Sequence, residues 1–328
     1  MPTRSALRCV AILVLIWSAP ATAESQPWTD PSRHTQVFVE TEPGVRLEVL
    51  DWGGTGQAVL LLAGHGDTAH IFDDFAPGLT GAFHVLGVTR RGFGSSSQPR
   101  QGYDLTTMVR DIQRIIDVLN LHRVDLVGHS IAGDEMTRFA LTHPDRVDKL
   151  VYLEAAYDRV EARRVESKFP QIPPQAQEEG SPEAIRSWVG QTEILMPEAE
   201  IRATRVFGAD GQFVRQVTPD SIAAEVATMV EHPDYASIRA PVLAIYTVYD
   251  NPAELAPRYK IASPETRQAL DQVFALWQTF AGSQRDSFRM SLPHAHIVEI
   301  RGASHYCFIS NRKQVTRAVL SFLGRSPQ

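Results

Sequence analysis

Cysteine is nearly absent from this 328-residue chain, which has only Cys9 and Cys307. We expect Cys9 to leave with a secretory signal, so that a single thiol remains and no disulfide forms within the mature chain. The stability of the fold must therefore come from a buried apolar core. A chain of this length with 43% apolar residues can build one.

An excess of positive charge is also missing. The chain has 32 Lys and Arg against 38 Asp and Glu, a net charge of −6, and loss of residues 1–23 with their two arginines would make it about −8. No basic run occurs, and no apolar run after the N-terminal segment is long enough to span a bilayer. These absences argue against nucleic acid as a partner and against a membrane anchor.

The first 23 residues have the pattern of a secretory signal peptide. Arg4 and Arg8 precede the apolar run Cys9–Trp17, and a small-x-small exit ends at Ala23. The run is too short to cross a membrane as a stable helix. We therefore expect cleavage after Ala23 and a secreted or periplasmic mature protein.

Most of the chain alternates between apolar strands and helical periodicity. Two segments with polar/apolar alternation come first, and the later strands are apolar throughout, which is typical of a parallel sheet covered on both faces. The expected strands are 36–40, 45–52, 58–63, 83–89, 124–127, 147–153, 242–247 and 296–300, and the expected helices are 70–79, 105–119, 131–142, 264–280 and 313–323. The predicted fold class is α/β, with a mostly parallel central sheet and helices on both faces.

Residues 155–238 interrupt this alternation. The segment has many charges and no apolar strand, yet side chains such as Trp188 and Met196 would be wasted on a solvated linker. We expect a helical cap here, inserted into a core formed by residues 24–154 and 239–328. Such a cap would lie over the carboxyl ends of the strands, with Trp188 and Met196 in the substrate pocket.

The sequence Gly128-His129-Ser130-Ile131-Ala132-Gly133 stands between a predicted strand and a predicted helix. A serine on such a sharp turn projects its hydroxyl, and small neighbours let the backbone fold tightly. The turn would aim the Ile131 amide at the space above Ser130, and the His65 amide would complete an oxyanion hole. The alternative is an ordinary strand–helix connection in which Ser130 is only a helix cap.

Four further segments make the chain similar to the α/β-hydrolase superfamily, in particular to its cap-bearing, esterase-like serine hydrolases. In chain order these are Ala63-Gly64-His65, where the family usually has His-Gly-x, Arg91-Gly92-Phe93-Gly94-Ser95-Ser96, Pro241-Val242-Leu243 followed by Asp250, and Gly302-Ala303-Ser304-His305. The resemblance runs from about Gln36 to Leu323. It implies the α/β-hydrolase fold with an inserted helical cap.

A serine hydroxyl becomes a useful nucleophile when a neighbouring base takes its proton, and His305 is the candidate base for Ser130. A carboxylate must then orient the histidine and stabilise its protonated form. We favour Asp250, which follows the expected strand 242–247. Glu154 is the rival, because it ends the preceding strand and related folds sometimes take the acid from there.

The residues leave no clear place for a metal or a cofactor. His294 and His296 share one strand face, but no third ligand is evident, so we predict neither a metal site nor a cofactor. Gly64–Ala69 formally fits a dinucleotide-binding loop, and Arg90 with Arg91 could meet a 2′-phosphate of NADP. The expected export and the absence of any Tyr-x-x-x-Lys argue against that oxidoreductase.

The predicted function is therefore hydrolysis of a small-molecule ester or lactone through an acyl-enzyme. An amide hydrolase or a cofactor-free perhydrolase could use the same residues. A non-catalytic binding protein on this fold is the more distant alternative. The cap would choose the substrate, and its sequence does not say which.

Overall fold

The computed structural model describes residues 28–172 and 179–324. The predicted signal peptide, residues 1–23, lies outside the described residues. Trp28–Pro31 form neither helix nor strand, and from Ser32 the chain is a separate unit that contains the whole fold. No helix in the described ranges is both long and apolar enough to cross a membrane.

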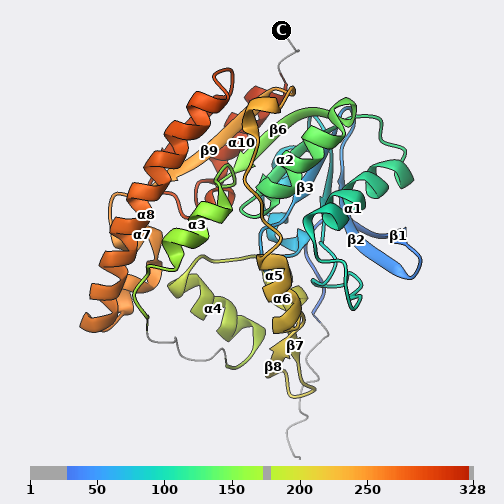
Figure 1. Cartoon of the computed structure of the whole chain (residues 1–328). Coiled ribbons are helices and arrows are strands. Elements are labelled where there is room, and N and C mark those ends of the chain that lie inside the picture. The colour runs from blue at the N-terminus through green and yellow to red at the C-terminus, as the bar shows by residue number, and fades with distance from the viewer. Residues whose placement is uncertain (1–27, 173–178, 325–328) are drawn as a thin grey trace, which may run out of the picture. The chain divides into compact units, whose positions relative to one another are not determined.

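The centre of this unit is an eight-stranded sheet in the order β1-β2-β4-β3-β5-β6-β9-β10 (Figure 1). β2 pairs antiparallel with β1 and β4, and every pairing from β4 to β10 is parallel. The strands are β1 (Thr35–Glu42), β2 (Val45–Gly53), β3 (Ala58–Leu62), β4 (His84–Val88), β5 (Val124–His129), β6 (Val147–Leu153), β9 (Val242–Val248) and β10 (His296–Arg301). The predicted fold class, and a strand at each predicted position, are confirmed.

Two apolar cores cover the two faces of the sheet, because side chains alternate between faces along strands that are buried on both sides. One core contains side chains of α1 (Leu105–Val118), α2 (Ala132–Thr142) and α8 (Pro264–Ser291). The other contains side chains of η1 (Ala69–Phe72), α9 (Cys307–Ser310) and α10 (Arg312–Leu323). In Figure 1, α1 and α2 lie side by side.

One predicted helix is wrong. Residues 70–79 form two 3-10 turns, η1 and η2 (Ala76–Gly78), instead of one α-helix. Pro77 lacks the amide hydrogen that a continuous helix would need, and its ring would crowd the preceding turn. By contrast, α8 continues to Ser291, well past the predicted end at residue 280.

The described residues between β6 and β9 form four helices, a 3-10 turn and a hairpin. These are α3 (Arg159–Glu166), α4 (Pro182–Thr192), α5 (Glu198–Thr204), β7 (Arg205–Phe207), β8 (Phe213–Gln216), α6 (Asp220–Ala227) and η4 (Tyr235–Ser237). The hairpin was not expected, because both strands are short, β7 is only half-buried and β8 is largely exposed. The segment contacts the loops that follow β3 and β4, through hydrogen bonds from Thr68 to Glu200 and from Thr218 to the Gly92 carbonyl.

Candidate active site

Ser130 occupies a strained turn between β5 and α2. Its backbone is left-handed, with φ +54°, a conformation that non-glycine residues rarely adopt. Gly133 makes the turn possible, since a Cβ at that position would lie 2.1 Å from the Ala155 carbonyl oxygen. The amide of Ser130 donates to the Leu153 carbonyl of β6 at 3.2 Å. The local sequence therefore places the hydroxyl at the carboxyl end of the parallel strands.

His305 lies within hydrogen-bond reach of this hydroxyl. It follows β10 in a loop that begins at Gly302, whose φ is +68°. The distance between His305 Nε2 and Ser130 Oγ is 3.0 Å, with the hydroxyl placed to donate to the ring nitrogen. The His305 side chain is 39% exposed, so the pair is open to a substrate. The structure thus brings together the two residues predicted as nucleophile and base.

Glu154 is the carboxylate that faces the histidine. It directly follows β6, has a left-handed φ of +51° and is completely buried. Its Oε2 lies 3.5 Å from His305 Nδ1, while its Oε1 accepts hydrogen bonds from the Thr247 amide at 2.5 Å and the Tyr157 hydroxyl at 3.0 Å. Two fixed donors therefore hold one oxygen and leave the other directed at the ring.

Asp250, which we favoured from the sequence, does not approach His305. It forms an exposed ion pair with Arg301, and its amide donates to Glu254 at 2.8 Å. The preference for Asp250 over Glu154 is corrected by this geometry. The reason is the strand order: β6 lies next to β5, whereas β9 is one strand further from the serine.

His129, the residue before Ser130, packs against His305 and bonds to its backbone. It is buried, its Nε2 lies 3.1 Å from the His305 carbonyl oxygen, and the two ring centroids are 4.6 Å apart. Burial lowers the pKa of His129 well below its ordinary range, so the ring is neutral and Nε2–H donates. The sequence analysis missed this positioning role, although a histidine within a buried strand end was a signal for it.

Arg90 is a second residue whose role was missed. Its guanidinium donates to the carbonyls of Ala63 and Gly64 at 2.9 and 3.1 Å, and it holds Glu135 of α2 by two hydrogen bonds of 2.6 and 3.0 Å. All of these groups are buried. Arg90 therefore ties the loop after β3 to the helix that begins behind the nucleophile.

The two amides predicted for the oxyanion hole lie on the two elements that Arg90 joins. Ile131 is the N-cap of α2, and His65 lies in the loop after β3. Among the described residues, neither amide donates to a backbone carbonyl, so both are available to an anion. The His65 side chain lies under the inserted segment, with Nε2 2.8 Å from the Ala223 carbonyl oxygen of α6.

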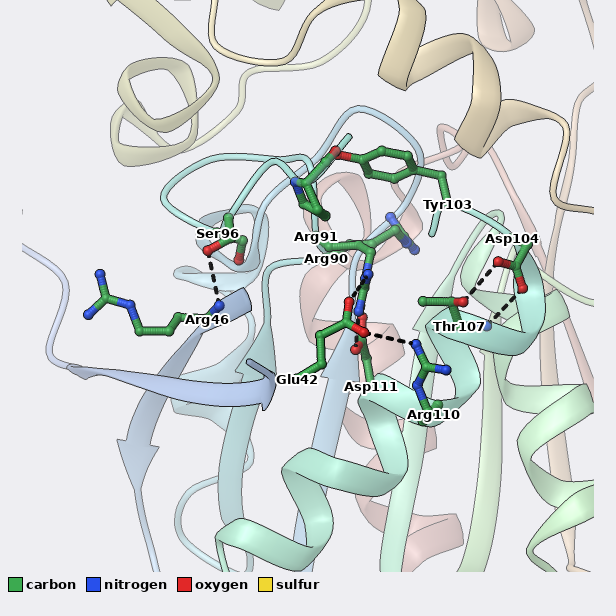
Figure 2. Close-up of polar contacts among 12 residues, drawn as sticks. Glu42, Arg46, Arg90, Arg91, Ser96, Tyr103, Asp104, Thr107, Arg110 and Asp111 are labelled. Atoms are coloured by element: carbon green, nitrogen blue, oxygen red, sulfur yellow. Dashed lines mark hydrogen bonds and ion pairs between the residues drawn. The ribbon is translucent and has the colours of Figure 1, made fainter. Parts of the chain in front are cut away.

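Arg91 has a purely internal role. Figure 2 shows this side chain with Glu42, Asp111 and Arg110. Its guanidinium is fully buried, donates twice to the Asp111 carboxylate at 2.6 Å and donates to Glu42 at 2.8 Å. Because the guanidinium of Arg90 is also paired, neither arginine is free to hold a cofactor phosphate. One of the two observations behind the NADP alternative, the pair of arginines, is thereby removed.

A pair of buried carboxyls lies where the inserted segment meets the core. Glu200 of α5 accepts hydrogen bonds from the Thr68 amide at 3.0 Å and the Thr68 hydroxyl at 2.5 Å. The neighbouring Asp67 accepts one from the Tyr306 hydroxyl at 3.3 Å. Burial raises the pKa of both carboxyls, and the charge of Asp67 raises that of Glu200 further. At least one of the two carboxyls therefore holds a proton near neutral pH.

The two predicted pocket residues belong to the apolar core that also contains side chains of η1, α9 and α10, or pack against it. Met196 is only 6% exposed and belongs to the same cluster as Ile185 and Ile201. Trp188 is partly buried and packs against that cluster. These contacts are those of packing residues, so a direct role of either side chain in the pocket stays a prediction.

Comparison with known proteins agrees with this fold. A family model described as the alpha/beta hydrolase fold matches residues 57–179. The chain is 36% identical over 107 residues to a fluoroacetate dehalogenase from Burkholderia sp., which covers 31% of this chain and 35% of that protein. It is 34% identical over 119 residues to a serine hydrolase-like protein from Homo sapiens, with 35% of this chain and 59% of that protein covered.

Both matches span less than two thirds of the relative. Among solved structures, E-2-(acetamidomethylene)succinate hydrolase superposes with a TM-score of 0.66 at 17% identity, over 89% of this chain and 100% of that one. At this identity the likeness concerns the fold alone. Together the matches show the alpha/beta hydrolase fold and leave the activity and the substrate open.

Proposed function

We propose that this chain, which belongs to the α/β-hydrolase superfamily, is a serine hydrolase that cleaves a carboxylic ester or a lactone. The observation that carries the proposal is the continuous relay from Ser130 to His305 to Glu154, with distances of 3.0 and 3.5 Å. A serine, a histidine and a buried carboxylate in this order are the groups that acyl transfer requires.

In this mechanism Ser130 Oγ attacks the substrate carbonyl carbon while His305 Nε2 takes the hydroxyl proton. The carbonyl oxygen becomes an oxyanion, which accepts hydrogen bonds from the amides of Ile131 and His65. The intermediate then collapses, His305 returns the proton to the departing alcohol oxygen, and an acyl-enzyme on Ser130 remains. A water molecule, deprotonated by His305, then attacks the acyl carbon. The bond between that carbon and Ser130 Oγ breaks, His305 returns the proton to Oγ, and the acid leaves.

Glu154 orients the ring and stabilises its charged form in both steps. Thr247 and Tyr157 bind Oε1 and so fix the orientation of the carboxylate, which keeps Oε2 facing His305 Nδ1. The His305 ring is then held as the tautomer whose Nε2 accepts the serine proton. His129 fixes the backbone of the same residue from the other side.

The similarity to a dehalogenase does not extend to the nucleophile needed for displacement of a halide. Such a displacement would use a carboxylate at the elbow, and this chain has a serine there. Amide hydrolysis and perhydrolysis remain alternatives on the same residues, because they differ in the leaving group or the attacking molecule. Rates on matched esters, lactones and amides, with and without peroxide, would separate them.

We further propose that residues 155–238 act as the cap that selects substrate. The contacts of Ala223 with His65 and of Glu200 with Thr68 support this, since both involve the loop that supplies an oxyanion amide. Export after cleavage at Ala23 is part of the same proposal. N-terminal sequencing of the protein secreted by its host would test it, and an intact N-terminus would contradict it.

The decisive experiment is active-site labelling with a fluorophosphonate. The parent protein should react once, at Ser130, and Ser130→Ala should not react. Equal labelling of both proteins would refute the serine hydrolase proposal. An unlabelled but ester-cleaving parent would point to a different nucleophile.

A further inference from the structure

A second cluster of chemically active side chains lies beside the start of the sheet, and the mechanism above does not use it. It consists of His34, His70 and Asp73. His34 directly precedes β1, His70 lies in η1, and Asp73 ends η1. In a 3-10 turn, side chains at positions i and i+3 project to the same side, so His70 and Asp73 meet there.

The three side chains converge closely enough to share one ion. His34 Nε2 lies 3.5 Å from Asp73 Oδ1, and His70 Nδ1 lies 3.1 Å from Asp73 Oδ2. The possible ligand atoms of the group lie within 4.8 Å of one another. Ligands about 2.1 Å from a tetrahedral zinc ion lie roughly 3.4 Å apart, which is close to the 3.5 and 3.1 Å of the two histidine–aspartate pairs.

The surroundings also suit a cation. The side chains of His34, His70 and Asp73 are 9%, 12% and 2% exposed, so water is largely excluded. The Trp52 indole donates to Asp73 Oδ1 at 3.3 Å, and the fully buried Glu48 carboxylate faces His70 Nε2 at 4.0 Å. A carboxylate behind the second nitrogen is the usual arrangement for a histidine that ligates a metal.

We propose that His34, His70 and Asp73 form a zinc site. Two imidazoles and one carboxylate are a donor set that suits Zn²⁺ better than Mg²⁺ or Ca²⁺, which prefer oxygen ligands alone. The ion would join the segment that enters β1 to η1, which follows the loop carrying His65. Its role is structural, because none of its ligands belongs to the relay of Ser130, His305 and Glu154.

The test uses the full mature protein, purified without a polyhistidine tag and freed of metal with a chelator. Titration with Zn²⁺ alone should show one site per chain, and saturation should raise the Tm by about 5 °C, as a ligand at about 100 times its Kd does for a chain of this size. Co²⁺ in place of Zn²⁺ should give visible d–d absorption. Failure of the parent protein to bind Zn²⁺ would overturn the proposal.

Variants locate the site. His34→Ala and Asp73→Asn should weaken Zn²⁺ binding by about 100-fold or more, and His34→Ala is the safer change because His34 lies outside the strands and turns. His84→Ala is the matched control, since His84 forms a similar 3.0 Å pair with Asp51 but belongs to no group of three possible ligands in the described part of the chain. Zn²⁺ binding by His34→Ala that equals the parent's would place the metal elsewhere and overturn the proposal.

The experiment does not depend on the proposed hydrolase activity. Ser130→Ala should bind Zn²⁺ as the parent does, because the two sites share no residue. Inactive protein that still binds one Zn²⁺ would contradict the function and support the metal site. If the protein is active and its His34→Ala variant binds Zn²⁺ as the parent does, the function is supported and the metal site is contradicted.

Discussion

Ser130 and Glu154 occupy equivalent positions, each directly after the last paired residue of one of two neighbouring parallel strands. β5 and β6 pair His129 with Leu153, and the next residue on each strand turns into the left-handed region, with φ of +54° and +51°. The same backbone step thus directs a nucleophile and a carboxylate from adjacent strands toward one histidine. Backbone strain of this kind costs about 1–3 kcal/mol per residue and persists where the surrounding structure fixes it.

Ser130→Gly and Ser130→Ala should both be inactive but should differ in stability. Glycine adopts a positive φ without a Cβ clash, so Ser130→Gly should be more stable than Ser130→Ala by about 1 kcal/mol. Urea unfolding of the two variants measures this difference. Equal free energies of unfolding would mean that the turn stores no strain at this residue.

Glu154→Gln should lower kcat by about 10⁴-fold, because the amide no longer stabilises the charged ring or fixes its tautomer. The Thr247 amide can still donate to the glutamine oxygen, so the fold should survive. Asp250→Asn removes only an exposed ion pair with Arg301 and should change kcat by less than about 2-fold. Ester hydrolysis by both variants decides the matter, and a larger loss in Asp250→Asn would return the role to Asp250.

Arg90→Met should destabilise the protein by about 3–5 kcal/mol, because it leaves the Glu135 carboxylate buried without its partner. The double variant with Glu135→Leu removes both charges and should recover most of that stability. Its kcat should still be low, because the loop carrying the His65 amide has lost the donors to Ala63 and Gly64. Full activity in a stable double variant would show that Arg90 does not position the oxyanion hole.

Glu200→Gln should flatten the dependence of stability on pH. Burial raises the pKa of Glu200 in the folded protein above its ordinary value. Between the ordinary carboxyl pKa of about 4 and the raised folded value, the folded state therefore holds more protons than the unfolded state. This contribution to stability is complete below about pH 4 and is lost as the pH rises through the folded pKa.

The Tm of Glu200→Gln minus the Tm of the parent should therefore be larger at pH 8 than at pH 5. Glu183→Gln is the control, because Glu183 is exposed and a hydrogen bond from Ser181 lowers its pKa instead. Thermal unfolding at several pH values measures both. A Tm difference between Glu200→Gln and the parent that is the same at every pH would exclude a proton on Glu200 in the folded protein.

The sequence by itself determined the order and type of most elements. Strands such as Ala58–Leu62 are apolar on both faces, and a parallel sheet covered on both sides buries such strands. The glycines around Ser130 likewise predicted a tight turn, because few other residues fit into such a turn. These features are local, and local features can be recognised along the chain.

Only the tertiary structure decided which carboxylate faces His305. Glu154 directly follows β6 and Asp250 lies two residues past the end of β9, and the choice between them depends on the order β5-β6-β9 in the sheet, which no local pattern encodes. The same holds for the Arg90–Glu135 pair and for the meeting of His34 with His70. Their partners are distant in the sequence, so their contacts exist only once the sheet and its loops have been assembled.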